Sequence, residues 1–193
     1  QIDANGGGLQ SISDLSGLTS ITELRLFTNQ LTDIGGLSAL TSLNFLRLDS
    51  NQLTDIGDLS GLTSLSVLYL NNNQLTAIAY LSGLTSLSRL YLNNNQLTDI
   101  GDISSLTSLS ILYLYNNQLT DIGGIGSASL TNIRLEGNAL IQSCVDQVFN
   151  DLDSLGASNG SCNVSGGTNS APSVASDTAR TNLIAKGWTL VYN

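Results

Sequence analysis

Few side chains of this 193-residue sequence could carry out chemistry, and most of those are carboxylates. The sequence has no histidine, which removes the commonest general base and the commonest metal ligand. Regularly spaced aspartates could transfer protons or bind Ca²⁺ weakly, but aspartate also favours turns. They are Asp33, Asp55, Asp99 and Asp121 at one position and Asp14, Asp58 and Asp102 at another. We interpret them as solvated turns and expect no catalytic residue, no metal site and no cofactor.

The two cysteines, Cys144 and Cys162, lie in the same C-terminal part of the sequence. A disulfide closing a loop of about 18 residues would stabilise the fold by about 3 kcal/mol. Low lysine, abundant serine, threonine and asparagine, and possible glycosylation sequences at Asn159 and Asn163 are typical of secreted proteins. We therefore expect a disulfide and a secreted or cell-surface location, with two buried thiols as the alternative.

The charge balance excludes some partners. Fifteen acidic residues against six basic ones give a net charge of −9 at pH 7. Such a field repels phosphate backbones, so we do not expect nucleic acid as a partner. No apolar run approaches the roughly 18 residues of a membrane-spanning helix, so no membrane span is expected.

Tyrosine and arginine offer binding chemistry, because both are enriched at the hot spots of protein interfaces. Tyr69, Tyr91 and Tyr113 follow one another at a constant spacing, and Arg25 and Arg47 precede them at the same spacing. A purely structural explanation is also available, since rings and guanidinium groups stack on one another across strands. The two roles are compatible.

This spacing belongs to an internal repeat that extends from the start of the chain to Leu140. Leu40-Thr41-Ser42-Leu43 recurs at a constant interval, beginning at Leu62, Leu84 and Leu106. Each copy reads L-T-S-L-x-x-L-x-L-x-x-N-x-L-T-x-I-x-x-L-S-x, the pattern of a leucine-rich repeat. Its Asn-x-Leu-Thr-Asp-Ile segment resembles the 22-residue repeats of bacterial internalins. The resemblance implies a right-handed solenoid and a non-enzymatic interaction protein.

The physics of the repeat predicts the same architecture. Leu65, Leu68 and Leu70 would point inward from a short strand, and stacked coils would form a concave parallel sheet. The convex side is too short for full helices, so 3₁₀ turns or extended segments are expected there. A buried column of amides requires backbone partners in neighbouring coils. It would contain Asn29, Asn51, Asn73, Asn95, Asn117 and Asn138.

The outward positions of the predicted strands form the candidate binding surface. We expect it to bind a protein or a glycan. The predicted contact residues are Arg25, Phe27, Phe45, Arg47, Tyr69, Arg89, Tyr91, Tyr113, Tyr115 and Arg134.

The pattern changes after Leu140, and residues 141–193 are expected to add two helix-containing coils to the solenoid formed by residues 1–140. Ser143 is the expected cap of the first helix, and Gly156 its end. The second is expected to start at Ser176 or Asp177 and to run to Lys186. The segment resembles the ends of some bacterial surface repeat proteins.

Both ends of the sequence fall in mid-coil. By register Ile2 and Ala4 occupy inward strand positions, and no helical cap like that of internalins precedes them. The last expected strand runs from Trp188 to Tyr192, with Leu190 at its centre. The alternative function is therefore a structural subunit that assembles head to tail into an extracellular fibre, because open sheet edges pair readily.

Overall fold

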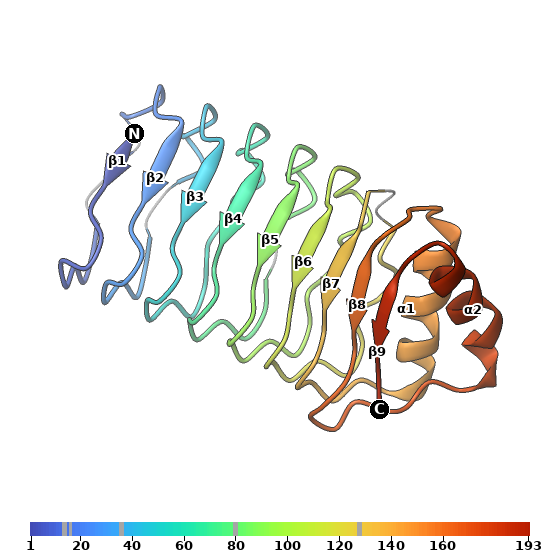
Figure 1. Ribbon diagram of the computed structural model, residues 1–193. Helices are drawn as coiled ribbons and strands as arrows, with labels where there is room; N and C mark the ends of the chain where they lie inside the picture. Colours follow the sequence, from blue (N-terminus) through green and yellow to red (C-terminus); the bar gives the residue numbers. More distant parts are fainter. Residues whose placement is uncertain (13–14, 16, 35–36, 79–80, 127–128) are drawn as a thin grey trace.

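The computed structural model describes residues 1–12, 15, 17–34, 37–78, 81–126 and 129–193, so Asp14 lies outside the described residues. Nine short strands form one parallel sheet in which strand order follows chain order (Figure 1). The strands are β1 (Ile2–Asp3), β2 (Glu23–Arg25), β3 (Phe45–Arg47), β4 (Val67–Tyr69), β5 (Arg89–Tyr91), β6 (Ile111–Tyr113), β7 (Asn132–Arg134), β8 (Ser161–Asn163) and β9 (Thr189–Val191).

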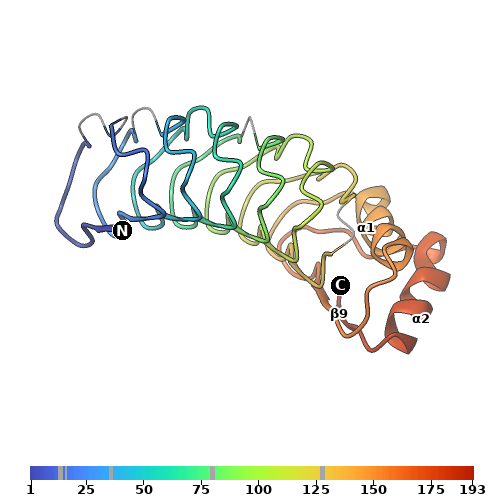
Figure 2. The ribbon, with the colours of Figure 1, turned by 90° about the horizontal axis from the view of Figure 1, so that it is seen from above.

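The coils stack into a curved solenoid with the sheet along its inner side (Figure 2). Two helices, α1 (Gln142–Ser154) and α2 (Asp177–Ala185), lie on the outer side near the C-terminus, with the short 3₁₀ helix η1 (Val174–Ser176) before α2. Between β2 and β7, the outer side consists of turns and extended segments wherever the structure describes it. The predicted solenoid and its two C-terminal helices are thus confirmed.

Identical register from coil to coil aligns the leucines of the core. Leu24, Leu46, Leu68, Leu90 and Leu112 are consecutive partners across the sheet, and each is fully buried. Because a single coil cannot enclose its own apolar side chains, each depends on its neighbours for burial. One continuous hydrophobic core therefore runs along the solenoid.

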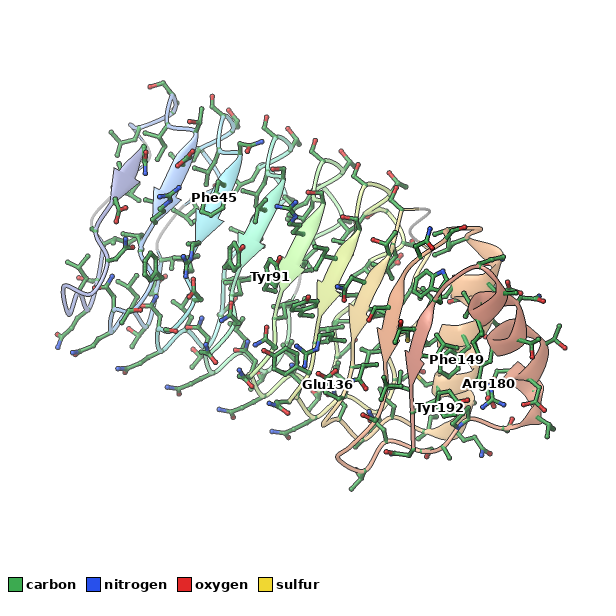
Figure 3. The ribbon with its side chains drawn as sticks, in the orientation of Figure 1. Phe45, Tyr91, Glu136, Phe149, Arg180 and Tyr192 are labelled. Atoms are coloured by element: carbon green, nitrogen blue, oxygen red, sulfur yellow. The ribbon has the colours of Figure 1, made fainter. Side chains whose placement is uncertain are left out.

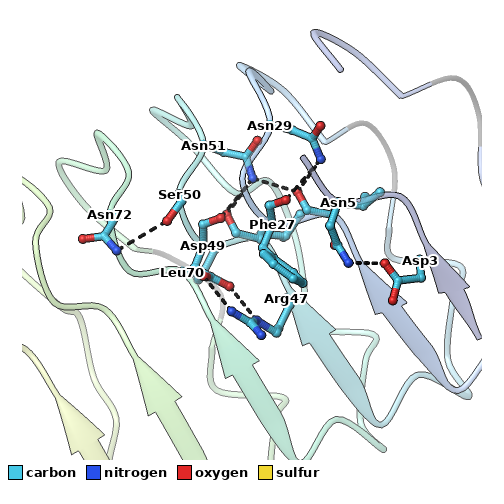
Figure 4. Close-up of polar contacts among 12 residues, drawn as sticks. Asp3, Asn5, Phe27, Asn29, Arg47, Asp49, Ser50, Asn51, Leu70 and Asn72 are labelled. Carbon is cyan, nitrogen blue, oxygen red and sulfur yellow. Dashed lines mark hydrogen bonds and ion pairs between the residues drawn. The ribbon is translucent and has the colours of Figure 1, made fainter. Parts of the chain in front are cut away.

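A column of buried asparagines ties each coil to the previous one (Figure 4). Asn95 is typical: its Nδ2 donates to the carbonyl of Leu70 at 3.0 Å and to that of Leu92 at 2.9 Å. Its Oδ1 accepts from the amide of Leu75 at 3.1 Å. The amide thus bonds backbone groups of two coils and satisfies the buried Leu75 amide, while each carbonyl is shared with the asparagine of a neighbouring coil.

The column continues one coil further than the sequence predicts. Asn169 is buried, accepts from the amide of Leu140 at 2.8 Å, and donates to the carbonyls of Leu135 and Val164. The repeat spacing places glycines at this point, so Asn169 was missed. The longer turn between Val164 and Asn169 moves the amide out of the repeat period.

The C-terminal coils differ from the prediction in two details. Ser143 does not cap α1, because the cap position is Ile141 and Ser143 lies within the first turn. Trp188 is not part of the last strand: its indole is buried, and its Nε1 donates to the carbonyl of Ala157 at 2.9 Å. The ring packs so closely that a Cβ on Gly160 would lie 2.4 Å from it.

The expected disulfide is absent from the structure, in which Cys144 and Cys162 are both buried free thiols. They lie on opposite walls of the coil: Cys162 points inward from β8, whereas Cys144 is on α1 beside Ile122 and Asp121. Burial raises the pKa of Cys144 to about 12 and also raises that of Cys162. Both thiols are therefore protonated and unreactive at neutral pH.

The buried amide column predicts a large cost for a single truncation. Asn95→Ala leaves the buried Leu75 amide without a partner and removes one of the two asparagine donors from each of the Leu70 and Leu92 carbonyls. It should lower the free energy of unfolding by about 1–3 kcal/mol. Urea denaturation followed by circular dichroism measures it. The control is Gln96→Ala, at an exposed neighbouring residue, which should stay within about 0.5 kcal/mol of wild type. Equal effects of the two changes would contradict the role of the column.

Asp146 predicts a pH-dependent contribution to stability. It lies buried on α1 and accepts hydrogen bonds from the Ser173 amide and the Ser176 hydroxyl. Burial acts to raise the pKa of Asp146, but the bonds from both serines outweigh it and hold the pKa below its ordinary value. The stabilisation is therefore present above the unfolded-state pKa of about 3.9 and is lost as pH falls through the folded-state pKa.

Asp146→Asn should consequently lower the free energy of unfolding by about 1–3 kcal/mol near pH 7. The loss should be smaller near pH 3, below the unfolded-state pKa, because protonation of Asp146 in the unfolded chain reduces the stabilisation that the charge gives the folded state. Urea denaturation at the two pH values measures the difference. Asp99→Asn, at an exposed carboxylate, is the control and should have little effect at either pH. A deficit in Asp146→Asn that did not change with pH would show that the charge is not involved.

Candidate binding surface

The inner side of the sheet, which we call the concave face, presents three columns of outward side chains. The ten predicted contact residues all lie in these columns, between β2 and the turn after β7. The first column contains Glu23, Phe45, Val67, Arg89, Ile111 and Asn132, the middle column Arg25, Arg47, Tyr69, Tyr91, Tyr113 and Arg134, and the last column Phe27, Asp49, Asn71, Asn93, Tyr115 and Glu136.

Aromatic rings form a continuous ladder along the middle of this face (Figure 3). Tyr69 and Tyr91 stack almost parallel, with ring centroids 4.3 Å apart and an interplanar angle of 8°. Tyr91 meets Tyr113 edge to face at 5.1 Å, and Tyr113 lies 6.2 Å from Tyr115. Both geometries are favourable for aromatic quadrupoles, so the ladder fixes the ring positions before any partner arrives.

Arginines extend the ladder at both ends by cation–π contacts. The Arg47 guanidinium lies 3.9 Å from the ring centroid of Phe27 and 5.2 Å from that of Tyr69. At the other end Arg134 lies 4.3 Å from Tyr115. Stacking of rings and guanidinium groups across the strands is therefore present in the fold, and the four tyrosines remain partly exposed.

Three carboxylates that the sequence analysis did not select complete the face. Each pairs with an arginine two residues away along the chain, Glu23 within β2 and Asp49 and Glu136 in the segments just after β3 and β7. Arg25 contacts Glu23 at 3.0 Å, Arg47 contacts Asp49 at 2.8 Å, and Arg134 contacts Glu136. The sequence signal for these pairs is the presence of opposite charges two residues apart, within a predicted strand or just after it. The hydrogen bonds that the Arg47 guanidinium donates to the Asp49 carboxylate raise the pKa of Arg47.

The face can supply hydrogen bonds and apolar contacts, but its central ring, Tyr91, is not a proton-transfer group near pH 7. Burial, reinforced by the adjacent Tyr69 hydroxyl, raises the pKa of Tyr91 to about 12. Tyr91 therefore remains a neutral phenol. The described part of the chain contains no group of three or more potential metal ligands among its Cys, Asp and Glu side chains.

The residues predicted to make end-to-end contacts lie at or beside β1 and β9, the first and last strands of the sheet. Ile2 and Ala4 are partly buried and line a cavity of about 220 Å³ in the first coil, together with Leu9, Ile12 and Leu15. At the other end Trp188 is buried and unavailable, which corrects its assignment as an end contact.

Leu190 and Tyr192 remain accessible in part at the C-terminal end. Leu190 is partly buried, whereas the Tyr192 side chain is 40% exposed. The Tyr192 ring packs edge to face on Phe149 at 5.7 Å, and the Arg180 guanidinium lies 5.2 Å from it.

Within the part of the chain that the structure describes, none of the helices has both the length and the apolar character that a membrane span requires.

The chain belongs to the leucine-rich repeat family. The sequence model described as Leucine Rich repeats (2 copies) matches residues 19–61, 41–84, 63–106 and 85–127, which together cover more than half of the chain. A comparison with curated proteins gives no match. Successive matched ranges begin 22 residues apart, at residues 19, 41, 63 and 85.

Among solved structures, the chain is similar to two internalins of Listeria monocytogenes. Internalin C2 has a TM-score of 0.80 at 26% identity, covering 99% of this chain and 79% of the internalin. Internalin InlF has a TM-score of 0.70 at 25% identity, covering 93% of this chain and 51% of the other. The chain therefore spans about half of InlF.

YopM from Yersinia enterocolitica is also similar, with a TM-score of 0.59 at 26% identity over 72% of this chain and 34% of YopM. Together with the family match, these similarities identify the chain as an internalin-like leucine-rich repeat protein of the bacterial type.

Proposed function

We propose that the chain is a non-enzymatic binding protein whose concave face, centred on Tyr69, Tyr91 and Tyr113, holds a protein partner. The observation that carries the proposal is the ring ladder itself, bounded by Arg47 and Arg134. Preordered tyrosines and arginines lose little conformational entropy on binding, and these residue types dominate interface energetics.

The orientation of the rings favours a protein over a glycan. Sugars bind aromatic side chains mainly by stacking on an open ring face. Here the Tyr69 ring lies between Arg47 and Tyr91, and Arg134 lies over Tyr115. Ring edges and hydroxyl groups remain for the partner, and they suit the mixed polar and apolar surface of a protein.

The charge of the face supports the same conclusion. Counting Asp3, which aligns with Arg25 in the sheet, the face carries four arginines and four carboxylates, although the whole chain has a net charge of −9. A neutral aromatic surface within an acidic molecule is suited to docking, because the binding region escapes the repulsion generated elsewhere.

The proposed location is the cell surface or the extracellular medium. It rests on the composition, which is low in lysine and rich in serine, threonine and asparagine. The free thiols of Cys144 and Cys162 add no support to it.

Tyr91→Ala tests the concave face. It removes the central ring of the ladder and should weaken binding of a purified partner by about 2 kcal/mol, or roughly 30-fold in Kd. Calorimetric titration of the partner against each variant gives the value, and a wild-type circular dichroism spectrum verifies the fold. Asp99→Asn, on the convex side, is the matched control and should bind like wild type. Equal losses in the two variants would rule out the concave face as the binding surface.

A second candidate function is head-to-tail self-association of the 193-residue chain, favoured by apolar surface at both ends of the sheet. The first coil contains the cavity lined by Ile2 and Ala4, and β9 offers Val191, 44% exposed, beside Tyr192. Pairing of β9 with β1 of another copy would continue the parallel sheet. Such a contact is heterologous and propagates unless its rotation closes a ring.

Sedimentation velocity over a range of concentrations tests this association. At high salt, which screens the net charge, the average mass should rise with concentration. Ile2→Asp should restore the monomer because it places a charge in the joint, whereas Ile141→Asp, at an exposed position on the convex side, should not. A wild-type chain that stays monomeric throughout would refute the second candidate.

A further inference from the structure

Arg89 differs from the other arginines of the concave face. Arg25, Arg47 and Arg134 each pair with a carboxylate two residues away along the chain. The corresponding outward neighbour of Arg89 is Tyr91, and its partners across the sheet are Val67 and Ile111. Within the described part of the chain, Arg89 makes no ion pair, and its side chain is exposed.

The position of Arg89 is also central. It begins β5, the fifth of nine strands. The outward positions of β4, β5 and β6 and the turns after them contain one charged side chain, that of Arg89. The others are Val67, Tyr69, Asn71, Tyr91, Asn93, Ile111, Tyr113 and Tyr115. One uncompensated positive charge therefore stands in the middle of a surface of aromatic, aliphatic and amide groups.

The surroundings of Arg89 would strengthen an ion pair formed there. Val67 is only 8% exposed and Ile111 is partly buried, so a docked partner would exclude water from the guanidinium on both sides. Removal of water lowers the local dielectric constant, and a bidentate arginine–carboxylate pair gains from its geometry as well as its charge. Hot spots cluster at desolvated interface centres of this kind.

We infer that the protein partner inserts the carboxylate of an aspartate or glutamate against Arg89, with apolar side chains beside it on Val67 and Ile111. This inference rests on the proposed function and specifies its partner. The partner segment as a whole is neutral or basic, since the remaining charge of the chain repels a strongly acidic one.

Selection of a random peptide library displayed on phage against the immobilised full chain tests the inference. Peptides that bind wild type but not Tyr91→Ala should be enriched in a single Asp or Glu next to apolar residues. Their affinity for Arg89→Gln should fall about tenfold or more, because truncating one member of a desolvated charge pair leaves the other unpaired. The control, Arg180→Gln on α2, away from the concave face, should bind them like wild type.

A double-mutant cycle tests whether Arg89 contacts the peptide carboxylate directly. Replacing the peptide carboxylate by its amide should weaken binding to wild type by the same factor and leave binding to Arg89→Gln nearly unchanged. Because Arg89 is exposed, its substitution should not alter the thermal unfolding midpoint, which separates a lost contact from a lost fold.

The outcomes distinguish this inference from the proposed function. Peptides that require Tyr91 but bind equally to wild type and Arg89→Gln would overturn the inference and leave the concave-face proposal standing. A library that yields no peptide dependent on Tyr91 would count against both. Arg89-dependent binding of an oligouronate, with no acidic peptide selected, would show that the carboxylate belongs to a glycan and overturn the protein assignment.

Discussion

The buried asparagine column is the interaction on which the rest of the structure depends. Each amide bonds the backbone of its own coil and of the previous one, as Asn95 does with Leu92 and with Leu70 and Leu75. An unpaired amide in this apolar interior would be costly, so neighbouring coils can stack in only one register. The repeat period of the sequence thereby becomes a constant translation in space, and the leucines of successive coils share one core.

The same register determines what the concave face contains. Residues one period apart become neighbours across the sheet, so a spacing in the sequence becomes a contact, as for Tyr69 and Tyr91. Outward positions carry none of the core packing and can differ between coils while the scaffold stays unchanged. The pattern of ring, guanidinium, amide and carboxylate is therefore the part of the sequence in which binding specificity can vary.

The repeat made the solenoid, the inward leucines and the outward columns predictable, because strict periodicity leaves a single consistent register. Contacts without periodicity were not predictable. A longer turn brings Asn169 into the buried asparagine column, at a point where the repeat spacing places glycines. Trp188 is buried against Gly160. Likewise, the spacing of Cys144 and Cys162 in the sequence gave a plausible loop length but could not show that α1 and β8 place the thiols on opposite walls.

The charge arrangement of the concave face also lay beyond the repeat pattern, because an ion pair depends on which side chains turn toward one another. Pairing with a carboxylate two residues away neutralises Arg25, Arg47 and Arg134 locally and holds their guanidinium planes against aromatic rings. These three arginines therefore act chiefly as rigid walls of the surface, with little charge left to attract a partner. Arg89 differs from them, because among the described residues it pairs with no carboxylate of its own chain. Its charge is therefore left for a carboxylate of the partner to neutralise.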